Sequence, residues 1–269
     1  MGTFADDTAV EPLGQARYGA EVTERWTVLG GVPNGGYLMA IAARAMAGEA
    51  SHPDPVSVTG HFLRPTAVGP ATVEVEVLKR GRRLSQVAAR LVQEGDTRLQ
   101  LLGAFADLEV LDGPTKLDRQ PPALPPRGET VDANASADEH GTFAPPILRQ
   151  LDVHMPAATL GWSLGQPDGT GEMRGWCRLA DDEELDVFGL LMMADAFPPA
   201  VFNSGAPVGW TPTIEMTTQI RKRPAPGWLA GRFATGSITG GYLEEDGELW
   251  DEAGDVVCLS RQLALAARA

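Results

Sequence analysis

The sequence predicts an α+β protein of two similar halves, in each of which an antiparallel sheet wraps one long helix. Three observations support this prediction: an internal repeat, one long helical pattern in each half, and alternating segments after each helix. The chain has 269 residues, of which 43% are hydrophobic and 22% charged, so it can form two domains with a hydrophobic core.

The repeat consists of short matches in one register. The pair Arg64-Pro65 lies 159 residues before Arg223-Pro224, and the same shift relates Gly81 to Gly240, Leu84 to Leu243, Gly95 to Gly254 and Asp96 to Asp255. In each copy the shared Gly-Asp pair joins two alternating segments, residues 84–94 with 97–108 and residues 243–253 with 256–265. This spacing is typical of hairpins.

One helical segment precedes these strands in each half. Residues 34–48 and residues 186 to about 197 have helical apolar spacing, and GYLMAIA superposes on GLLMMAD at a shift of 153 residues. A further strand-like run precedes each Arg-Pro pair, at residues 56–63 and 213–222. We therefore expect a strand, a helix and about four strands in each half.

The segment between the copies, residues 112–146, is rich in Pro, Gly and charge and lacks sustained periodicity. We expect an extended crossover linker there, between an N-terminal domain of residues 1–111 and a C-terminal domain of residues 147–269. Two such halves can pair their sheets edge to edge, which protects the exposed edges. The predicted architecture is therefore one extended sheet.

Charge and composition exclude several classes of partner. A net charge of −14 opposes nucleic acid, because binding phosphates requires a dense basic surface. The first residues lack a signal peptide's basic and apolar regions, and no apolar run is long enough to span a bilayer. The 4 His and 2 Cys lack metal-ligand spacing. We expect a soluble, cytoplasmic protein without metal, nucleic-acid or membrane partners.

Three strings resemble the acyl-CoA thioesterase II family: GHFLRPTAVGPATVEVEVLKRGRR in the first half, and TIEMTTQIRKRPAPGWL and DVVCLSRQLAL in the second. The resemblance covers most of residues 15–110 and 147–266. It implies two hot-dog folds in one chain and hydrolysis of fatty acyl-CoA by a water molecule, without a cofactor. The implied partner is acyl-CoA, and exposed sheet edges or faces lead us to expect a homo-oligomer.

In this family an acid, an amide and a hydroxyl position the water. The resemblance places them on Asp195 in LLMMADAF, Gln262 in LSRQL and Thr213 in PTIE. One extra residue lies between this Thr-Ile-acid string and the Arg-Pro pair, which leaves Thr217 and Thr218 as alternatives for the hydroxyl. The chain also has Met-Thr-Thr where the family has a His-aromatic pair.

The repeat provides an internal comparison for two of these residues. Asp195 corresponds to Ala42, and Gln262 corresponds to Gly103. Apolar surroundings would raise the pKa of Asp195, as a general base near neutrality requires. On the strand face of Gln262, bulky residues become smaller ones in the second copy: Leu99, Leu101 and Phe105 are replaced by Cys258, Ser260 and Ala264. This exchange predicts space beside the second helix.

Each of these three residues also has a structural interpretation. Asp195 can face solvent between two apolar stripes, and Thr213 can belong to a solvated strand face. Gln262 is a surface residue if Leu259, Leu263 and Leu265 fill the core instead.

Asn34, Gly35 and Gly36 lead directly into the first helix and are predicted to bind substrate. Glycines let backbone N–H groups approach a ligand, and the positive helix end suits a carbonyl that develops negative charge. The alternative is an ordinary N-cap with flexible glycines. Two further charged segments are interpreted as solvated, the acidic run at residues 181–184 and the basic hairpin at 79–83, although the latter or residues 221–223 could meet CoA phosphates.

Other functions remain open. Residues 161–165 match the GxSxG motif of α/β-hydrolases, but all His residues precede Ser163, whereas that fold needs its catalytic His after the Ser. A non-catalytic acyl-CoA binding module has the same fold without a competent water. A hot-dog enoyl-CoA hydratase would need an Asp/His dyad, and no His lies near Asp195 in the sequence.

Overall fold

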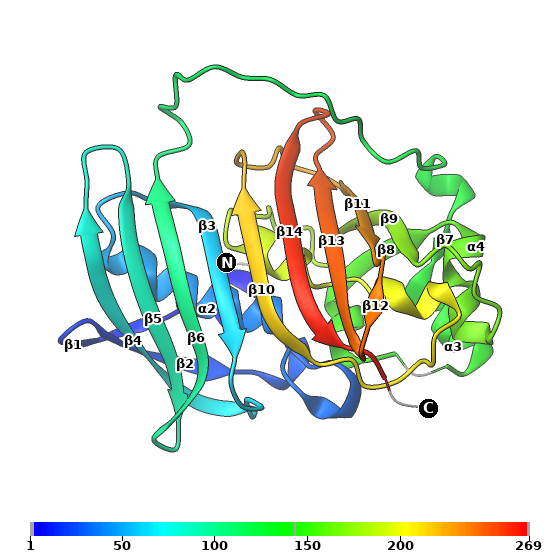
Figure 1. Cartoon of the computed structure of the whole chain (residues 1–269), viewed down its shortest axis with the longest axis horizontal. Helices are drawn as coiled ribbons and strands as arrows, with labels where there is room; N and C mark the ends of the chain where they lie inside the picture. The colour runs from blue at the N-terminus through cyan, green and yellow to red at the C-terminus, as the bar shows by residue number, and fades with distance from the viewer. Residues whose placement is uncertain (1–2, 143, 268–269) are drawn as a thin grey trace.

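The computed structural model describes residues 3–142 and 144–267. Its strands form one antiparallel sheet of 14 strands in the order β1-β2-β4-β5-β6-β3-β10-β14-β13-β11-β9-β8-β7, with β12 beside β13 (Figure 1). The sheet bends around a layer of helices on one side. The first half supplies β1 to β6, and all other strands follow the long loop that crosses between the halves.

The strands of the first half are β1 (Glu11–Gly14), β2 (Arg17–Val22), β3 (Asp54–Phe62), β4 (Gly69–Arg80), β5 (Ser85–Gln93) and β6 (Asp96–Ala106). Its helical elements are α1 (Thr3–Asp7), η1 (Glu24–Trp26), η2 (Leu29–Gly31) and α2 (Gly35–Glu49), where η marks a short 3-10 helix.

The strands that follow are β7 (Val131–Asp132), β8 (Leu151–Met155), β9 (Glu172–Leu179), β10 (Thr213–Ile220), β11 (Leu229–Ala234), β12 (Ile238–Thr239), β13 (Tyr242–Trp250) and β14 (Val256–Leu265). The helical elements are η3 (Arg127–Glu129), α3 (Ala133–His140), η4 (Pro146–Gln150), α4 (Ala157–Leu160), η5 (Gly161–Leu164), α5 (Gly189–Met193) and η6 (Ala200–Ser204).

The two halves join edge to edge, as predicted. Strand β3 pairs with β10 in antiparallel register, with Thr59 opposite Thr217, and the hydroxyl oxygens of these two residues lie 2.9 Å apart. This pairing removes one exposed edge from each half. The predicted α+β class and the single extended sheet are confirmed.

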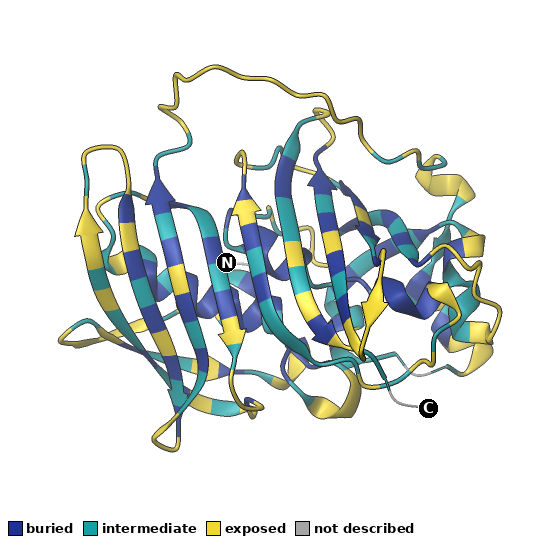
Figure 2. Ribbon diagram, in the orientation of Figure 1, coloured by how far each residue is buried: buried dark blue, intermediate teal, exposed yellow. Residues whose placement is uncertain are grey.

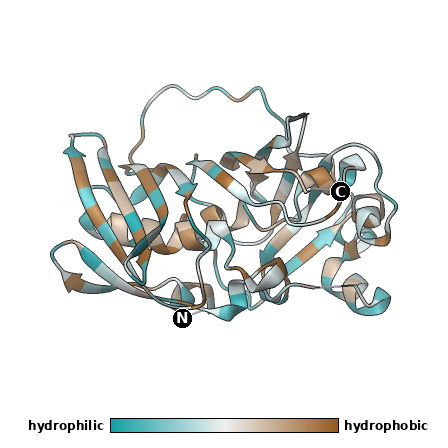
Figure 3. Ribbon diagram, turned by 60° about the horizontal axis from the view of Figure 1, so that its bottom comes forward, coloured by the Kyte–Doolittle hydropathy of each residue, from teal (hydrophilic) through white to brown (hydrophobic). Residues whose placement is uncertain are grey.

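The core lies between the sheet and α2. Burial alternates along the strands, and the helix lies behind the sheet with an apolar surface against it (Figures 2 and 3). At Gly60 of β3, an added Cβ would lie 3.2 Å from the sulfur of Met39 in α2. The helix therefore packs directly on the middle strands, and its residues 37–43 are all buried.

The second helix is much shorter than predicted. The sequence pattern predicts a helix over residues 186 to about 197, but α5 comprises only Gly189–Met193. The Asp186 side chain accepts a hydrogen bond from the Gly189 N–H at 2.8 Å, so the residues before α5 form a capping turn. After α5 the chain reaches Pro198 and Pro199, which cannot continue a helix.

The segment at residues 112–146 contains more structure than its composition suggests. After a long extended stretch it forms η3, β7 and α3, and β7 pairs with β8 at the edge of the sheet. Figure 1 shows the extended part passing from the end of β6 across to the side of the sheet where β7 lies. Because α3 is short and largely polar, its apolar periodicity is too weak to predict the helix.

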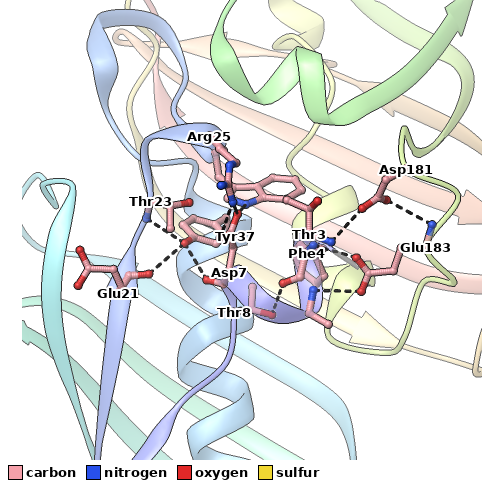
Figure 4. A network of polar contacts seen from close by, with 12 residues as sticks. Thr3, Phe4, Asp7, Thr8, Glu21, Thr23, Arg25, Tyr37, Asp181 and Glu183 are labelled. Atoms are coloured by element: carbon pink, nitrogen blue, oxygen red, sulfur yellow. Dashed lines mark hydrogen bonds and ion pairs between the residues drawn. The ribbon is translucent and has the colours of Figure 1, made fainter. Parts of the chain in front are cut away.

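The acidic run at residues 181–184 is only partly solvated, which corrects the sequence interpretation. Glu183 accepts hydrogen bonds from the N–H groups of Phe4 at 2.8 Å and Ala5 at 3.0 Å, and Asp181 accepts one from Thr3 at 2.9 Å (Figure 4). In the first half, the Tyr37 hydroxyl donates to the Asp7 carbonyl at 2.9 Å. The N-terminal helix α1 therefore connects a loop of the second half to α2.

Helices α2 and α5 approach each other so closely that only glycine fits between them. A Cβ at Gly36 would lie 2.4 Å from the Leu191 carbonyl oxygen and 2.9 Å from the Asp195 Cβ. A Cβ at Gly35 would lie 2.8 Å from the Phe62 ring. Gly36 is thus required by packing between the start of α2 and the end of α5, and Gly35 lies close against Phe62 of β3.

We expect Gly36→Ala to lower the free energy of unfolding by about 2 kcal/mol or more, because the added methyl group meets backbone that cannot move freely. Chemical denaturation measures this change. Gly113→Ala is the matched control, since no heavy atom lies within 4 Å of its added Cβ. Equal stability of the two variants would contradict the proposed packing constraint.

Candidate active site

The carboxylate of Asp195 lies at the N-terminus of α2, in the other half of the chain. Its Oδ2 accepts hydrogen bonds from the Asn34 side-chain amide and the Gly36 N–H, both at 2.9 Å. The same Asn34 Nδ2 donates to the Asp195 carbonyl at 2.8 Å, while Asn34 Oδ1 caps α2 by accepting from Tyr37 N–H at 2.9 Å. The helix end thus holds a negative charge where its dipole favours one.

Burial raises the pKa of Asp195 to about 6. Hydrogen bonds from the N–H groups of Gly36 and Gly35 and from the Asn34 amide oppose this rise, because they favour the ionised form. A carboxylate with this pKa is ionised at neutral pH yet can still accept a proton. The surroundings of Asp195 therefore suit a general base.

Thr213 and Gln262 form a hydrogen-bonded pair on neighbouring strands. The Thr213 hydroxyl of β10 donates to Gln262 Oε1 of β14 at 2.7 Å. Thr217 instead donates to Glu215 Oε1 at 2.7 Å, and Thr218 is fully buried, with no hydrogen-bond partner for its Oγ1 in the part of the chain that the structure describes. Of the three threonines, only Thr213 bonds to Gln262.

The side of β14 that carries Gln262 faces inward. Leu263 and Leu265, on the opposite side, are 39% and 38% exposed, whereas Cys258 and Ala264 are buried. In the first half, the corresponding Gly103 packs so tightly that a Cβ would lie 2.7 Å from the Met46 methyl group. Helix residue Ala42, the mate of Asp195, is fully buried in the core.

A cavity of about 610 Å³ brings the polar residues together. Asp195, Thr213 and Gln262 line it, and so do Asn34 and Gly35 of the first half. The rest of the wall is mainly apolar and includes Leu38, Phe62, Ile147, Trp162, Phe197 and Phe202. Gly36 lies behind this wall, where its N–H donates to Asp195.

Glu245 of β13 also lines the cavity, and the sequence analysis missed it. It lies opposite Gln262 in the strand register, and its Oε1 accepts from Gln262 Nε2 at 2.7 Å. Burial raises the pKa of Glu245 to about 7, and the charge of Asp195 adds to this rise. The hydrogen bonds from the Ala200 N–H and from Gln262 lower the pKa but do not cancel the effect of burial. Glu245 lies two residues after Leu243 and therefore on the same strand face, which was the signal in the sequence that it points inward. The acidic string around it, however, resembles a solvated hairpin turn.

Other motifs have structural partners. Ser163 of the GxSxG match lines the cavity, but its hydroxyl donates to the Leu160 carbonyl at 2.8 Å, and no histidine is among the described lining residues. Among the basic segments, Arg80 bonds to the Glu49 carbonyl and Arg223 pairs with Asp54 at 3.0 Å. Arg64, which belongs to the repeated Arg-Pro pair, lines the cavity.

Within the described residues, no group of three or more His, Cys, Asp or Glu side chains could hold a metal ion. The described helices are too short or too polar to cross a bilayer.

Solved structures and curated proteins that are similar to this chain match it over nearly its whole length. A Thermobifida fusca YX protein named as a candidate thioesterase II is 31% identical, with a TM-score of 0.88 over 100% of this chain and 98% of that one. A protein of unknown function with a hot dog fold from Alicyclobacillus acidocaldarius is 20% identical, with a TM-score of 0.86 over 100% of this chain and 99% of that one. The thioesterase-like protein TwmA of Talaromyces wortmannii is 25% identical over 97% of this chain and 91% of its own length.

Family models match both halves. Residues 22–106 match the acyl-CoA thioesterase N-terminal domain, and residues 121–266 match the acyl-CoA thioesterase C-terminal domain. Together with the single sheet and the buried central helix, these matches establish a double hot-dog fold. The chain belongs to the acyl-CoA thioesterase family.

Proposed function

We propose that this protein hydrolyses acyl-CoA thioesters, with Asp195 as general base and Thr213 and Gln262 as further ligands of the attacking water. The observation that carries the proposal is that these three side chains line one largely apolar cavity. An acid with a raised pKa, a hydroxyl and an amide next to an apolar wall provide a base, polar partners for water and space for an acyl group.

The reaction needs no nucleophilic side chain. Asp195 accepts a proton from the water as its oxygen attacks the thioester carbonyl carbon. The tetrahedral intermediate collapses with cleavage of the carbon–sulfur bond, and CoA leaves as a thiolate, which takes up a proton. The products are the free acid and CoA.

The start of α2 has two tasks in this proposal. Asn34 and Gly36 act through Asp195, because both donate to its carboxylate. Gly35 lines the cavity and its N–H also favours the ionised form of Asp195, so a carbonyl oxygen that develops negative charge is stabilised there by the positive end of the helix rather than by a free donor. The apolar remainder of the cavity receives the acyl chain.

The hydratase alternative lacks its histidine. His61 is paired with Glu215 in the strand register, and His154 packs edge-on against Trp228, 5.3 Å between ring centroids. Neither histidine lines the cavity, so the described residues give Asp195 no imidazole partner there. Hydrolysis by the Asp195 centre is therefore the function that we propose.

Asp195→Asn is expected to reduce thiol release from a panel of acyl-CoA substrates by about 10²-fold or more, because it removes the general base. Free CoA is measured with a thiol reagent. Asp118→Asn is the matched control, since its exposed side chain pairs with Lys116 outside the cavity. Parental rates in a folded Asp195→Asn protein would exclude Asp195 as the base, and a panel without any thiol release by the wild type would favour non-catalytic binding.

The pH dependence of kcat/KM follows from the pKa of Asp195. The base is active when ionised, so the rate should rise with pH through about 6 and then reach a plateau. Because the charges of Glu245 and Asp195 interact, the fall in kcat/KM on the acid side of the profile is expected to reflect the coupled titration of the two carboxyl groups. A rate that stays constant between about pH 5 and 8 would contradict this assignment.

The raised pKa also predicts a cost in stability. Native Asp195 binds a proton more readily than it does in the unfolded chain, so the contribution of this residue to the free energy of unfolding decreases as pH rises from about 4 to 7. Asp195→Asn lacks this loss, and its free energy of unfolding should exceed that of the wild type by on the order of 1 to 3 kcal/mol at pH 7.5, with little difference at pH 4. Urea denaturation at both pH values measures this; a pH-independent difference would show that burial does not raise the pKa.

A further inference from the structure

Glu245 is a buried carboxyl group in the cavity wall to which the proposed hydrolysis assigns no role. Only 5% of the residue is exposed. Among the described residues its hydrogen bonds come from Ala200 and Gln262 and from no Arg, Lys or His, and the nearby charged group that affects it is Asp195, of the same sign. A buried acid without a basic partner destabilises the fold, so its place beside Gln262 calls for a functional explanation.

Both oxygens of Glu245 accept hydrogen bonds. Oε2 accepts from the Ala200 N–H at 2.5 Å, and Oε1 accepts from Gln262 Nε2 at 2.7 Å. The Ala200 N–H can only donate, so the group facing it must be an acceptor. The ionised carboxylate, which predominates above the raised pKa of about 7, meets this requirement and presents a second acceptor to Gln262.

This second acceptor determines which way the Gln262 amide points. With Nε2 directed to Glu245, Oε1 is directed to Thr213, whose hydroxyl donates to it at 2.7 Å. The hydrogen bonds therefore run in one direction, from Thr213 to Gln262 to Glu245. If the amide were reversed, Gln262 would present a carbonyl oxygen to the carboxylate, and two acceptors would face each other.

The direction of this chain defines what the cavity offers to a water. The Thr213 hydrogen is used, so its oxygen can accept from the water, and the second hydrogen of Gln262 Nε2 can donate to it. In the proposed hydrolysis Asp195 accepts the other hydrogen of the water through Oδ1, because the bonds from Asn34 and Gly36 both end on Oδ2. A water bound in this way has one lone pair left for attack on a carbonyl.

We propose that Glu245 is a positioning residue, which fixes the orientation of the Gln262 amide and, through it, of the Thr213 hydroxyl. This inference rests on the proposed hydrolysis for its kinetic consequence, but the orientation itself can be tested independently. Glu245 acts through Gln262 and does not contact the substrate.

Glu245→Gln is the sharpest substitution, because it keeps the shape and introduces a donor. If the oxygen of the new Gln side chain faces Ala200, its NH₂ group faces Gln262 and favours the reversed orientation of the Gln262 amide. In the other orientation, the new NH₂ group faces the Ala200 N–H, and two donors oppose each other. We expect kcat to fall about tenfold or more while KM stays within about twofold. The matched control is Glu244→Gln on the other side of β13, where the carboxylate accepts from Gly236 N–H and Ser237. A loss confined to KM, or equal losses in both variants, would overturn the proposal.

A second arm distinguishes positioning from loss of stability. In a Gln262→Leu background no amide remains to be oriented, so adding Glu245→Gln should reduce kcat by less than about twofold further. If the two losses multiply, Glu245 acts independently of Gln262 and the proposal is wrong. Thermal unfolding of each variant reports the structural cost separately.

The third arm does not depend on activity. In ¹⁵N-glutamine-labelled protein, the Gln262 side-chain amide is assigned by its disappearance in Gln262→Leu. Its hydrogen bonded to Glu245 should resonate downfield and exchange slowly in wild type and Glu244→Gln, and lose both properties in Glu245→Gln. An unchanged resonance overturns the inference. If the wild type releases no thiol, the hydrolase proposal fails, while this resonance still tests the orientation.

Discussion

The contact between the Asp195 carboxylate and the N-terminus of α2 is the interaction on which the site depends. It joins the end of one half's helix to the start of the other's, through the Asn34 amide and the Gly36 N–H. Partial burial of the acid raises its pKa, and the helix end keeps it ionised at neutral pH. A side chain at Gly36 would collide with the Leu191 carbonyl, so a glycine is needed here for the two helices to come into contact. The N–H of the same glycine donates a hydrogen bond to Asp195.

The two halves have similar frameworks, and the cavity lies between them: its acid and amide come from the second half, and the start of α2 comes from the first. In the first half, Met46 and Phe105 fill the space at Gly103, where a Cβ would lie 2.7 Å and 3.0 Å from their side chains, and Ala42 is fully buried. In the second half, smaller residues on β14 and the early end of α5 leave room for Asp195 and Gln262. The long helix of one half thus stabilises the fold and orients the acid of the other half.

The cavity also carries an energetic cost. Asp195 and Glu245 are two acids without basic partners among the described contacts, and burial raises the pKa of both. Backbone N–H groups at Gly36 and Ala200 offset part of this cost because they are fixed by α2 and η6. Such fixed donors need no rearrangement during a reaction, which is why charged groups in an apolar cavity can be both costly and useful.

The sequence alone determined the double α+β architecture, since a repeat with a long apolar helix and alternating strands has few ways to bury its hydrophobic surfaces. The resemblance to the thioesterase family and the comparison of the repeated halves also pointed to Asp195, Gln262 and Thr213 around one water, with Thr217 and Thr218 left as alternatives for the hydroxyl. The short length of α5, the structure within residues 112–146 and the place of Glu245 were not predicted, because local patterns do not report on partners distant in sequence. Only the tertiary structure decided that the N-terminus of α2 meets Asp195, that Thr213 is the threonine bonded to Gln262, and that an acid on β13 faces inward. These outcomes depend on which strands become neighbours and how closely two helices approach, and packing across the whole chain sets both.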